Sequence, residues 1–184
     1  AIDAQGNPRI CYYYELNGDL RYASRSGGVW TAEVVDAAGL VGKYASLELD
    51  GQGNPHVAYW DESNVDLKYA RKSGGSWLVE IVDYSGGEHC SLALDAQGNP
   101  SICYRSIYGL EVATKWGNSW KDEIVVASTS TSHTSLRLGS DGYGRFAFCS
   151  TVGLGLRVAT QNAAGWSIQT VDAGAQSEYS CLAL

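Results

Sequence analysis

Short runs of alternating apolar and polar residues, separated by turns rich in Gly, Ser and Asn, extend along the whole chain. Ser91–Leu94 alternates and stops at an Asp-Ala-Gln-Gly-Asn-Pro turn, and His56–Trp60, Asp66–Ala70 and Trp77–Val82 are further runs of the same kind. A period of two is typical of half-buried β-strands, and turn residues between such runs are typical of antiparallel hairpins. No window carries a helical period over about ten residues. The pattern therefore predicts an all-β protein.

The same pattern repeats four times. A turn of the form Asp-x-x-Gly-Asn-Pro begins at Asp3, Asp50 and Asp95, and a degraded copy begins at Gly139. Other landmarks recur in register with this turn, so we predict four repeats of about 46 residues, at 3–49, 50–94, 95–138 and 139–184. The recurring columns are Trp30, Trp77, Trp120 and Trp166, and the pairs Ser46-Leu47, Ser91-Leu92, Ser135-Leu136 and Cys181-Leu182.

Each repeat holds four short strands, which is typical of one blade of a β-propeller. The predicted fold class is thus an all-β β-propeller of four-stranded antiparallel blades, with residues 1–184 as a single propeller. A stacked β-solenoid is the main alternative, but solenoid repeats are usually shorter and contain fewer strands.

Composition and charge narrow the range of partners. The chain has 184 residues, of which 45% are hydrophobic and 18% charged, so it can bury a core and is not a disordered tail. Its net charge is -7 and it has no basic run, which argues against a nucleic-acid partner. No stretch approaches about 18 uninterrupted apolar residues, so no transmembrane helix is predicted.

The cysteines and the first residues bear on metal binding and on processing of the chain. The five cysteines form no Cys-x-x-Cys pair, so no zinc site is predicted. The sequence starts at Ala1 with neither an initiator Met nor an apolar leader, and we expect a mature, processed or excised segment.

Three motifs recur along the whole chain: D-x-x-G-N-P-h-h-x-Y, then L-[KR]-Y-A-x-[KR]-x-G-G-x-W, then S-L-x-L-D. In these motifs the repeat resembles bacterial propellers related to the sialidase or Asp-box superfamily. An Asp-box reads S-x-D-x-G-x-x-W, whereas this chain has Ala23-x-Arg25-x-Gly27-x-x-Trp30 and degenerate copies ending at the other three column tryptophans. The resemblance implies the propeller fold, and says little about activity because the fold hosts many functions.

The strand order of that family has consequences for ring closure. It makes Ser-Leu-x-Leu the innermost strand of each blade, so Ser180–Leu184 could complete the blade that Arg9–Tyr13 begins. A disulfide between Cys11 and Cys181 would then pin the ring; the alternative is that all five cysteines are small buried hydrophobes. Because Ala1-Ile2 duplicates the role of Ala183-Leu184, a longer propeller of six to eight blades or a homo-oligomeric, eight-bladed ring of two copies is also open.

Candidate ligand-binding residues lie where the inter-blade loops end. Two residues before each inner strand stands an aromatic or a histidine, and a carboxylate precedes it in two of the four copies. Aromatic faces stack on sugar CH groups and carboxylates accept sugar hydroxyls, so this column suits a glycan; the alternative is that it only caps the channel. The candidates are Tyr44, His89, His133 and Tyr179, then Glu88 and Glu178, with Trp60 and Trp116 as aromatics outside the tryptophan column.

Other site chemistry is less well supported. The acidic loop Tyr59–Asp66 could coordinate calcium, but its spacing does not match a calcium-loop motif, and a solvated acidic turn explains it as well. Two histidines without a carboxylate column do not predict a metal. The tryptophan column is interpreted as packing between blades.

The sequence contains neither G-x-S-x-G, H-E-x-x-H nor a P-loop. Arg21, Lys68 and Arg157 share one repeat column, as expected of a solvated face rather than of a sialidase arginine cluster. We therefore expect a non-catalytic, extracellular or secreted binding and adhesion propeller that recognises a glycan or a cell-surface protein. A structural spacer or fibre subunit is the alternative, and a sialidase-like glycoside hydrolase is a weaker one.

Overall fold

The structure is a computed structural model that describes residues 1–128, 131–150, 155–174 and 180–183. Within these ranges the regular structure consists of β-strands, as the alternating pattern predicts, and no helix is present that could cross a membrane.

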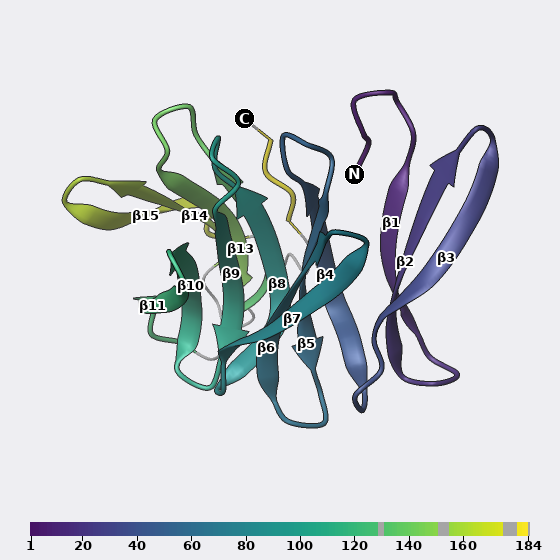
Figure 1. Cartoon of the computed structure of the whole chain (residues 1–184). Helices are drawn as coiled ribbons and strands as arrows, with labels where there is room; N and C mark the ends of the chain where they lie inside the picture. Colours follow the sequence, from purple (N-terminus) through teal and green to yellow (C-terminus); the bar gives the residue numbers. More distant parts are fainter. Residues whose placement is uncertain (129–130, 151–154, 175–179, 184) are drawn as a thin grey trace. The chain divides into compact units, whose positions relative to one another are not determined.

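In the described part of the chain, fifteen strands form four antiparallel sheets in which consecutive strands pair (Figure 1). We call these sheets blades 1 to 4 in chain order. Blade 1 contains β1 (Arg9–Tyr14), β2 (Asp19–Ser26) and β3 (Val29–Asp36). Blade 2 contains β4 (Val41–Leu49), β5 (Pro55–Asp61), β6 (Asp66–Ser73) and β7 (Ser76–Asp83). Blade 3 contains β8 (Gly86–Leu94), β9 (Pro100–Ser106), β10 (Gly109–Trp116) and β11 (Ser119–Val126). Blade 4 contains β12 (Thr131–Leu138), β13 (Gly144–Ser150), β14 (Gly155–Asn162) and β15 (Gly165–Asp172).

The prediction of four antiparallel sheets is confirmed, and blades 2 to 4 have the expected four strands. Each of blades 2 to 4 takes its first strand from the end of the preceding repeat, as β4 (Val41–Leu49) does for blade 2. Blade 1 has three strands among the described residues, with β1 at its edge. The chain forms two compact units, one of residues 1–88 with 96–98 and one of residues 89–95 with 99–184. Blades 1 and 2 therefore belong to the first unit, and blade 4 with nearly all of blade 3 belongs to the second. Closure into one ring stays a prediction.

The repeated turn is held by its own aspartate. Asp50 accepts hydrogen bonds from the backbone N–H groups of Gln52 and Asn54 at 2.9 and 2.8 Å, and from the side-chain amide of Asn54 at 2.8 Å. Gly53 has a φ of 81°, a conformation that residues with a Cβ rarely adopt. The corresponding bonds from Asn7 lower the pKa of Asp3 to about 2. Local bonds therefore form the same turn in successive repeats.

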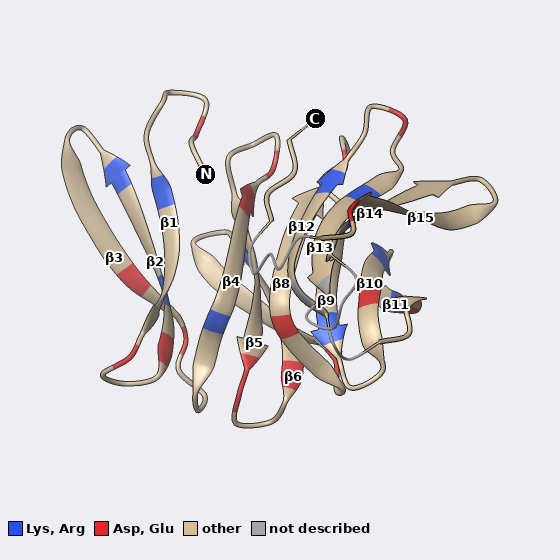
Figure 2. Ribbon diagram, turned by 180° about the vertical axis from the view of Figure 1, so that it is seen from behind, with Lys and Arg blue, Asp and Glu red and all other residues tan. Residues whose placement is uncertain are grey.

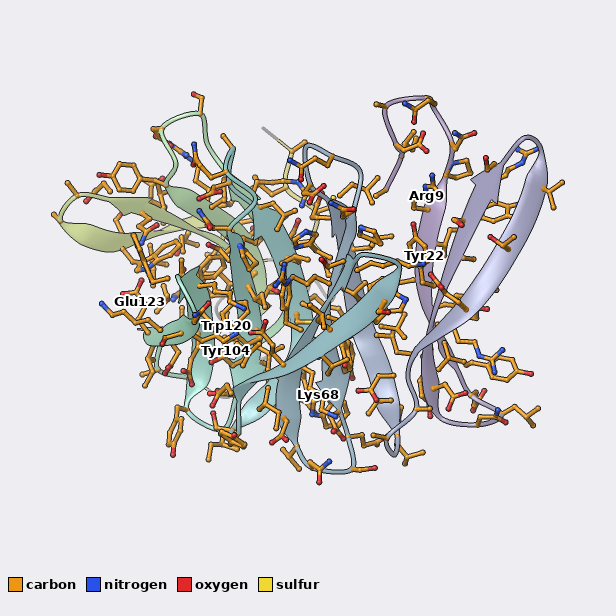
Figure 3. All side chains as sticks on the ribbon, in the orientation of Figure 1. Arg9, Tyr22, Lys68, Tyr104, Trp120 and Glu123 are labelled. Atoms are coloured by element: carbon orange, nitrogen blue, oxygen red, sulfur yellow. The ribbon has the colours of Figure 1, made fainter. Side chains whose placement is uncertain are left out.

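The core of the first unit lies between blades 1 and 2. Tyr22 of β2 packs edge-on against Trp77 of β7, with ring centroids 5.4 Å apart, so this member of the tryptophan column packs between blades as predicted. Tyr22 is only 5% exposed, and Figure 3 labels its position on β2. Around this contact lie the buried side chains of Leu20, Val35, Val41, Val57, Tyr59 and Ala70.

A buried ionic group crosses the same interface. Lys68 of β6, which is labelled in Figure 3, lies between Asp61 of its own blade, at 2.7 Å, and Asp36 of blade 1, at 3.3 Å. The hydroxyl of Tyr59 donates to Asp36 at 2.7 Å. Burial alone would raise the pKa of Asp61, but the hydrogen bonds from Lys68 and Asn64 outweigh it and lower that pKa. Each buried charge thus has an opposite charge or a hydrogen bond, as burial requires. Figure 2 marks the Lys and Arg positions in blue and the Asp and Glu positions in red along the strands.

In the second unit, the inner strands are joined by side-chain bonds to the backbone. The Ser91 hydroxyl of β8 accepts from Leu136 N of β12 at 2.9 Å, and the Thr134 hydroxyl donates to His89 O at 2.6 Å. Segment 180–183 repeats this pattern one step further: Leu182 N donates to the Ser135 hydroxyl at 2.9 Å and the Ser180 hydroxyl donates to His133 O at 3.1 Å. The segment therefore lies beside β12 as an inner strand does.

Candidate functional site

The inner strands β4, β8 and β12 share an unusual backbone feature at the predicted ligand column. Tyr44, His89 and His133 have φ values of 54°, 53° and 51°, in the left-handed region that non-glycine residues seldom occupy. The strand pairing is irregular here, with register shifts between Lys43 and Ser46 and between Ser132 and Ser135. Bulges of this kind re-aim side chains, and strained residues concentrate at functional sites.

In the first unit, this bulge presents an aromatic surface. The rings of Tyr44 and Trp60 lie 5.9 Å apart and tilted by 41°, and Tyr44 is 43% exposed. Lys43 forms an ion pair with Glu62 at 2.5 Å and lies 5.6 Å from the centre of the Tyr13 ring. The hydrogen bond that the Lys43 ammonium donates to Glu62 is the main cause that raises the pKa of Lys43. We call Tyr13, Lys43, Tyr44, Trp60 and Glu62 the aromatic patch.

In the second unit, the same column forms a histidine pair. The rings of His89 and His133 have their centroids 4.2 Å apart. Burial, followed by the neighbouring His133 and Arg105, lowers the pKa of His89 to about 4. His89 is therefore neutral near pH 7. Among the described residues, no group of three or more His, Cys, Asp or Glu could hold a metal ion.

The remaining predicted residues are placed separately. Glu88 lies on β8 in the first unit, next to His89 in the chain. Tyr179 and Glu178 lie outside the described residues. The structure therefore brings Tyr44 and Trp60 together, and His89 and His133 together.

The two cysteines of the predicted disulfide are free thiols, Cys11 half-buried in the first unit and Cys181 exposed in the second. Burial raises the pKa of the Cys11 thiol to about 11, which keeps it protonated and unreactive at neutral pH. The disulfide stays a prediction.

The acidic loop that could coordinate calcium uses its carboxylate internally. Asp61 is fully buried and is neutralised by Lys68, and Asn64 donates to it through its backbone N–H at 3.1 Å and its side-chain amide at 2.9 Å. These bonds describe a closed turn. Calcium binding here has no further support from the geometry.

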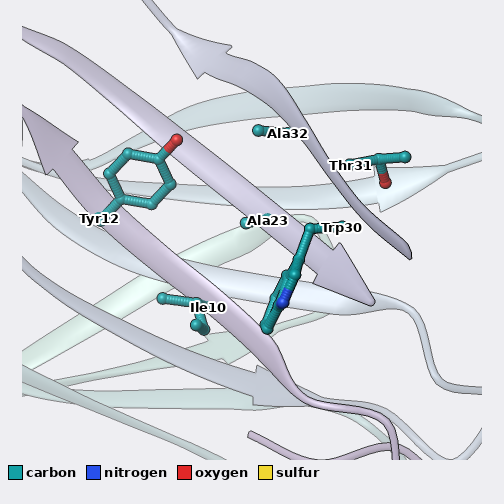
Figure 4. A pocket seen from close by; sticks show the side chains of 6 residues that line it. All are labelled: Ile10, Tyr12, Ala23, Trp30, Thr31 and Ala32. Carbon is teal, nitrogen blue, oxygen red and sulfur yellow. The ribbon is translucent and has the colours of Figure 1, made fainter. Parts of the chain in front are cut away.

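Blade 1 carries an apolar hollow on one face of its sheet (Figure 4). It has a volume of about 350 Å³ and is lined by Ile10, Tyr12, Ala23, Trp30, Thr31 and Ala32. Ile10 and Trp30 are 46% and 47% exposed, whereas Val57, which occupies the position of Ile10 in blade 2, is fully buried. The lining residues occupy the repeat positions that pack between blades elsewhere in the chain. We therefore interpret this face as a packing surface and not as a binding site.

The second unit contains a cavity of a different kind, between blades 3 and 4, with a volume of about 390 Å³. Its apolar wall includes Val112, Leu136 and Trp166, and its mouth carries Trp116, which is 70% exposed. The polar lining consists of Asp95, Ser101, Thr114, Lys121, Asp122, Glu123, Tyr143 and Gln161. We call this the blade-3/4 cavity. The sequence pointed to Trp116 as an aromatic outside the column, but the other lining residues carried no motif.

Neither a known protein-family profile nor a curated protein matches the chain. Solved structures do resemble it. A lectin mutant from Aleuria aurantia in complex with Fucα1-6GlcNAc matches with a TM-score of 0.70 at 18% identity, over 95% of this chain and 62% of that chain. A protein of unknown function from Dyadobacter fermentans matches with a TM-score of 0.59 at 12% identity, over 83% of this chain and 58% of that chain. A leech intramolecular trans-sialidase matches with a TM-score of 0.54 at 14% identity, over 83% and 28%.

At these identities the likeness shows the fold alone, and that fold is built of β-propeller blades. The chain spans 62% of the length of the Aleuria lectin that it resembles. Its neighbours include both a lectin and a glycan-processing enzyme, so function has to be argued from the residues of this chain.

Proposed function

We propose that this chain is a non-catalytic, carbohydrate-binding propeller and that the aromatic patch of the first unit is a glycan site. The observation that carries the proposal is the solvent-facing Tyr44, held by a left-handed bulge beside Trp60. An aromatic ring fixed at the surface stacks on the CH face of a sugar at little entropic cost. Lys43 and Glu62 at its rim supply a donor and an acceptor for sugar hydroxyls.

The fold likeness supports a binding role. The Aleuria aurantia protein is a lectin whose structure contains a fucosylated disaccharide. A lectin-like role for this chain, together with an extracellular location and adhesion, is part of the proposal.

The carboxylates beside the patch favour binding over hydrolysis. A glycosidase needs one carboxyl group that stays protonated as the acid and a second that is free to act as a base or nucleophile. Glu62 is paired with Lys43, and the neighbouring Asp61 is paired with Lys68 with its pKa lowered. A carboxylate that is paired with a lysine stays ionised, so it is poorly suited to donate a proton to a leaving group.

A glycan array followed by titration calorimetry tests the proposal. Tyr44→Ala is expected to weaken binding of the best array ligand about tenfold, because the stacking surface is lost. Tyr84→Ala is the matched control, since Tyr84 is an exposed tyrosine of the same unit outside the patch. Unchanged affinity in Tyr44→Ala would refute the patch as the site, and release of free sugar from the ligand would refute the non-catalytic role.

A further inference from the structure

The blade-3/4 cavity exists because two repeat positions carry smaller residues than their equivalents. Val112 of β10 stands where blade 1 has Tyr22, and Gly144 of β13 stands where blade 2 has Pro55. In the first unit, Tyr22 fills the space in front of Trp77. In the second unit, the smaller valine leaves a hollow in front of Trp166.

The walls of the cavity are fixed by hydrogen bonds. The indole N–H of Trp166 donates to Glu123 at 2.7 Å, which orients the ring of blade 4 against the outer strand of blade 3. The side-chain oxygen of Gln161 accepts from Gly144 N at 3.1 Å, which leaves its NH₂ group for a further acceptor. Trp166 also packs against Phe146, with ring centroids 5.3 Å apart. A cavity with such a rigid floor is preorganised for a ligand.

The rim of the cavity combines an aromatic face with hydroxyls and charges. Trp116 offers an exposed indole face, and Thr114 and Tyr143 contribute hydroxyl groups. Asp122 supplies a carboxylate, and Asp95 and Glu123 add negative charge while accepting from Asn99 and from the Trp166 indole. Among the lining residues, Lys121 contributes the one ammonium group. One flat apolar wall with acceptors and donors around it suits a sugar ring. The excess of carboxylates repels an anionic ligand.

We propose that the blade-3/4 cavity is a second carbohydrate site, separate from the aromatic patch, and that it takes a neutral sugar rather than a sialic or uronic acid. The inference rests on the proposed function in one respect, namely that the chain binds carbohydrate. It does not require the aromatic patch to be a binding site. The volume of about 390 Å³ falls at the small end of ligand pockets, as expected for a short glycan end.

The test is calorimetry and ligand-observed NMR on the whole chain. The probes are methyl glycosides of neutral hexoses, deoxyhexoses and N-acetylhexosamines, compared with those of sialic and glucuronic acid. Trp116→Ala removes the exposed wall, and Val112→Tyr fills the cavity with the residue that blade 1 already uses. Each variant is expected to weaken neutral-sugar binding at this site about tenfold. Tyr108→Ala is the matched control, an exposed aromatic of the same unit outside the cavity.

The outcomes separate this inference from the proposed function. Two neutral-sugar binding events, of which Tyr44→Ala removes one and Trp116→Ala the other, support both. Loss of all binding in Tyr44→Ala, with Trp116→Ala and Val112→Tyr unchanged, overturns the second site and leaves the patch intact. Loss only in Trp116→Ala and Val112→Tyr supports the cavity and refutes the patch. Stronger binding of the acidic glycosides at the cavity, or no binding of any probe, overturns the inference; thermal unfolding of each variant confirms that it is folded.

Discussion

The blade-1/2 interface and the blade-3/4 cavity are built from the same repeat positions, yet one is filled and the other is hollow. In the first unit, Tyr22 packs edge-on against Trp77 and leaves the interface closed. In the second unit, Val112 faces the equivalent Trp166 across about 390 Å³. The side chains at a few repeat positions therefore decide whether an interface is filled or hollow, because the strands that carry them are the same in both places.

The polar partners of the two tryptophans change together with the packing. In the first unit, Glu33 of blade 1 pairs with Lys72 of blade 2, and the indole N–H of Trp77 is buried without a hydrogen-bond partner among the described residues. In the second unit, Gln161 replaces Lys72, and the equivalent glutamate, Glu123 (labelled in Figure 3), accepts from the indole of Trp166 instead. The same carboxylate thus serves as an ion-pair partner in one interface and as an anchor for a cavity wall in the other.

The largest effect is expected from opening the filled interface. Tyr22→Val should give blades 1 and 2 the composition of blades 3 and 4 at this position, and it should lower the free energy of unfolding by about 2–4 kcal/mol because a buried ring is lost. Denaturant unfolding followed by tryptophan fluorescence measures this change. A loss below about 1 kcal/mol would mean that the tyrosine is not needed to close the interface.

A smaller loss is expected from crowding the hollow interface. A Cβ at position 144 would lie 2.8 Å from Cη2 of Trp166, so Gly144→Ala should push the ring away and cost about 1–2 kcal/mol of stability. Gly51→Ala is the control, because a Cβ there meets nothing within 4 Å and its φ is not in the left-handed region. Equal stability of the two variants in thermal unfolding would show that Trp166 is not held in the described position.

The units should also differ in their response to pH at the left-handed column. The pKa of His89 is lowered to about 4 in the folded state from its ordinary value of 6.5, so the unfolded chain takes up this proton first as pH falls. Stability from His89 is complete above pH 6.5 and declines as the pH falls toward 4, by about 1 kcal/mol after allowing for solvent screening.

His89→Asn should remove this part of the pH dependence, because asparagine tolerates positive φ and carries no titrating ring. Unfolding free energies of both proteins between pH 4 and 7.5 provide the measurement. Curves that stay parallel over the whole range would contradict a neutral, half-buried His89.

The smallest effect is expected from the ion pair that only the first interface has. Lys72→Gln gives blade 2 the residue found at Gln161, and it should cost below about 1 kcal/mol, since both partners are partly exposed. The loss should shrink further in high salt. A larger or salt-independent loss in denaturant unfolding would show that Lys72 acts through packing on Trp77, whose ring centre lies 5.8 Å from its ammonium group.

The fold was predictable from the sequence because its signals are local and repeated. Alternation marked the strands, and the Asp50 turn recurs with the same internal bonds as the Asp3 turn. The packing role of Trp77 followed from its place in a column. Blade 1 has three strands among the described residues, and the sequence assigns its fourth strand to Ser180–Leu184, a closure that stays a prediction.

The sites were harder to predict. Alignment placed Tyr44 and His89 in one column, but the left-handed backbone at this position has no signal in the residue types, which are neither Gly nor Asn. The blade-3/4 cavity forms because the small side chain of Val112 leaves space in front of Trp166. These two residues lie far apart in the chain. Such a cavity depends on which residues two different blades bring together, whereas a repeat pattern describes each position separately.

The contrast between Tyr22 and Val112 also bears on how such proteins diversify. A pocket made by a missing ring can be gained or lost by substitution at one position, while the backbone, the turns and the neighbouring blades stay as they are. Each interface of a repeat protein can therefore be closed or opened separately, and the fold of the other blades does not have to change.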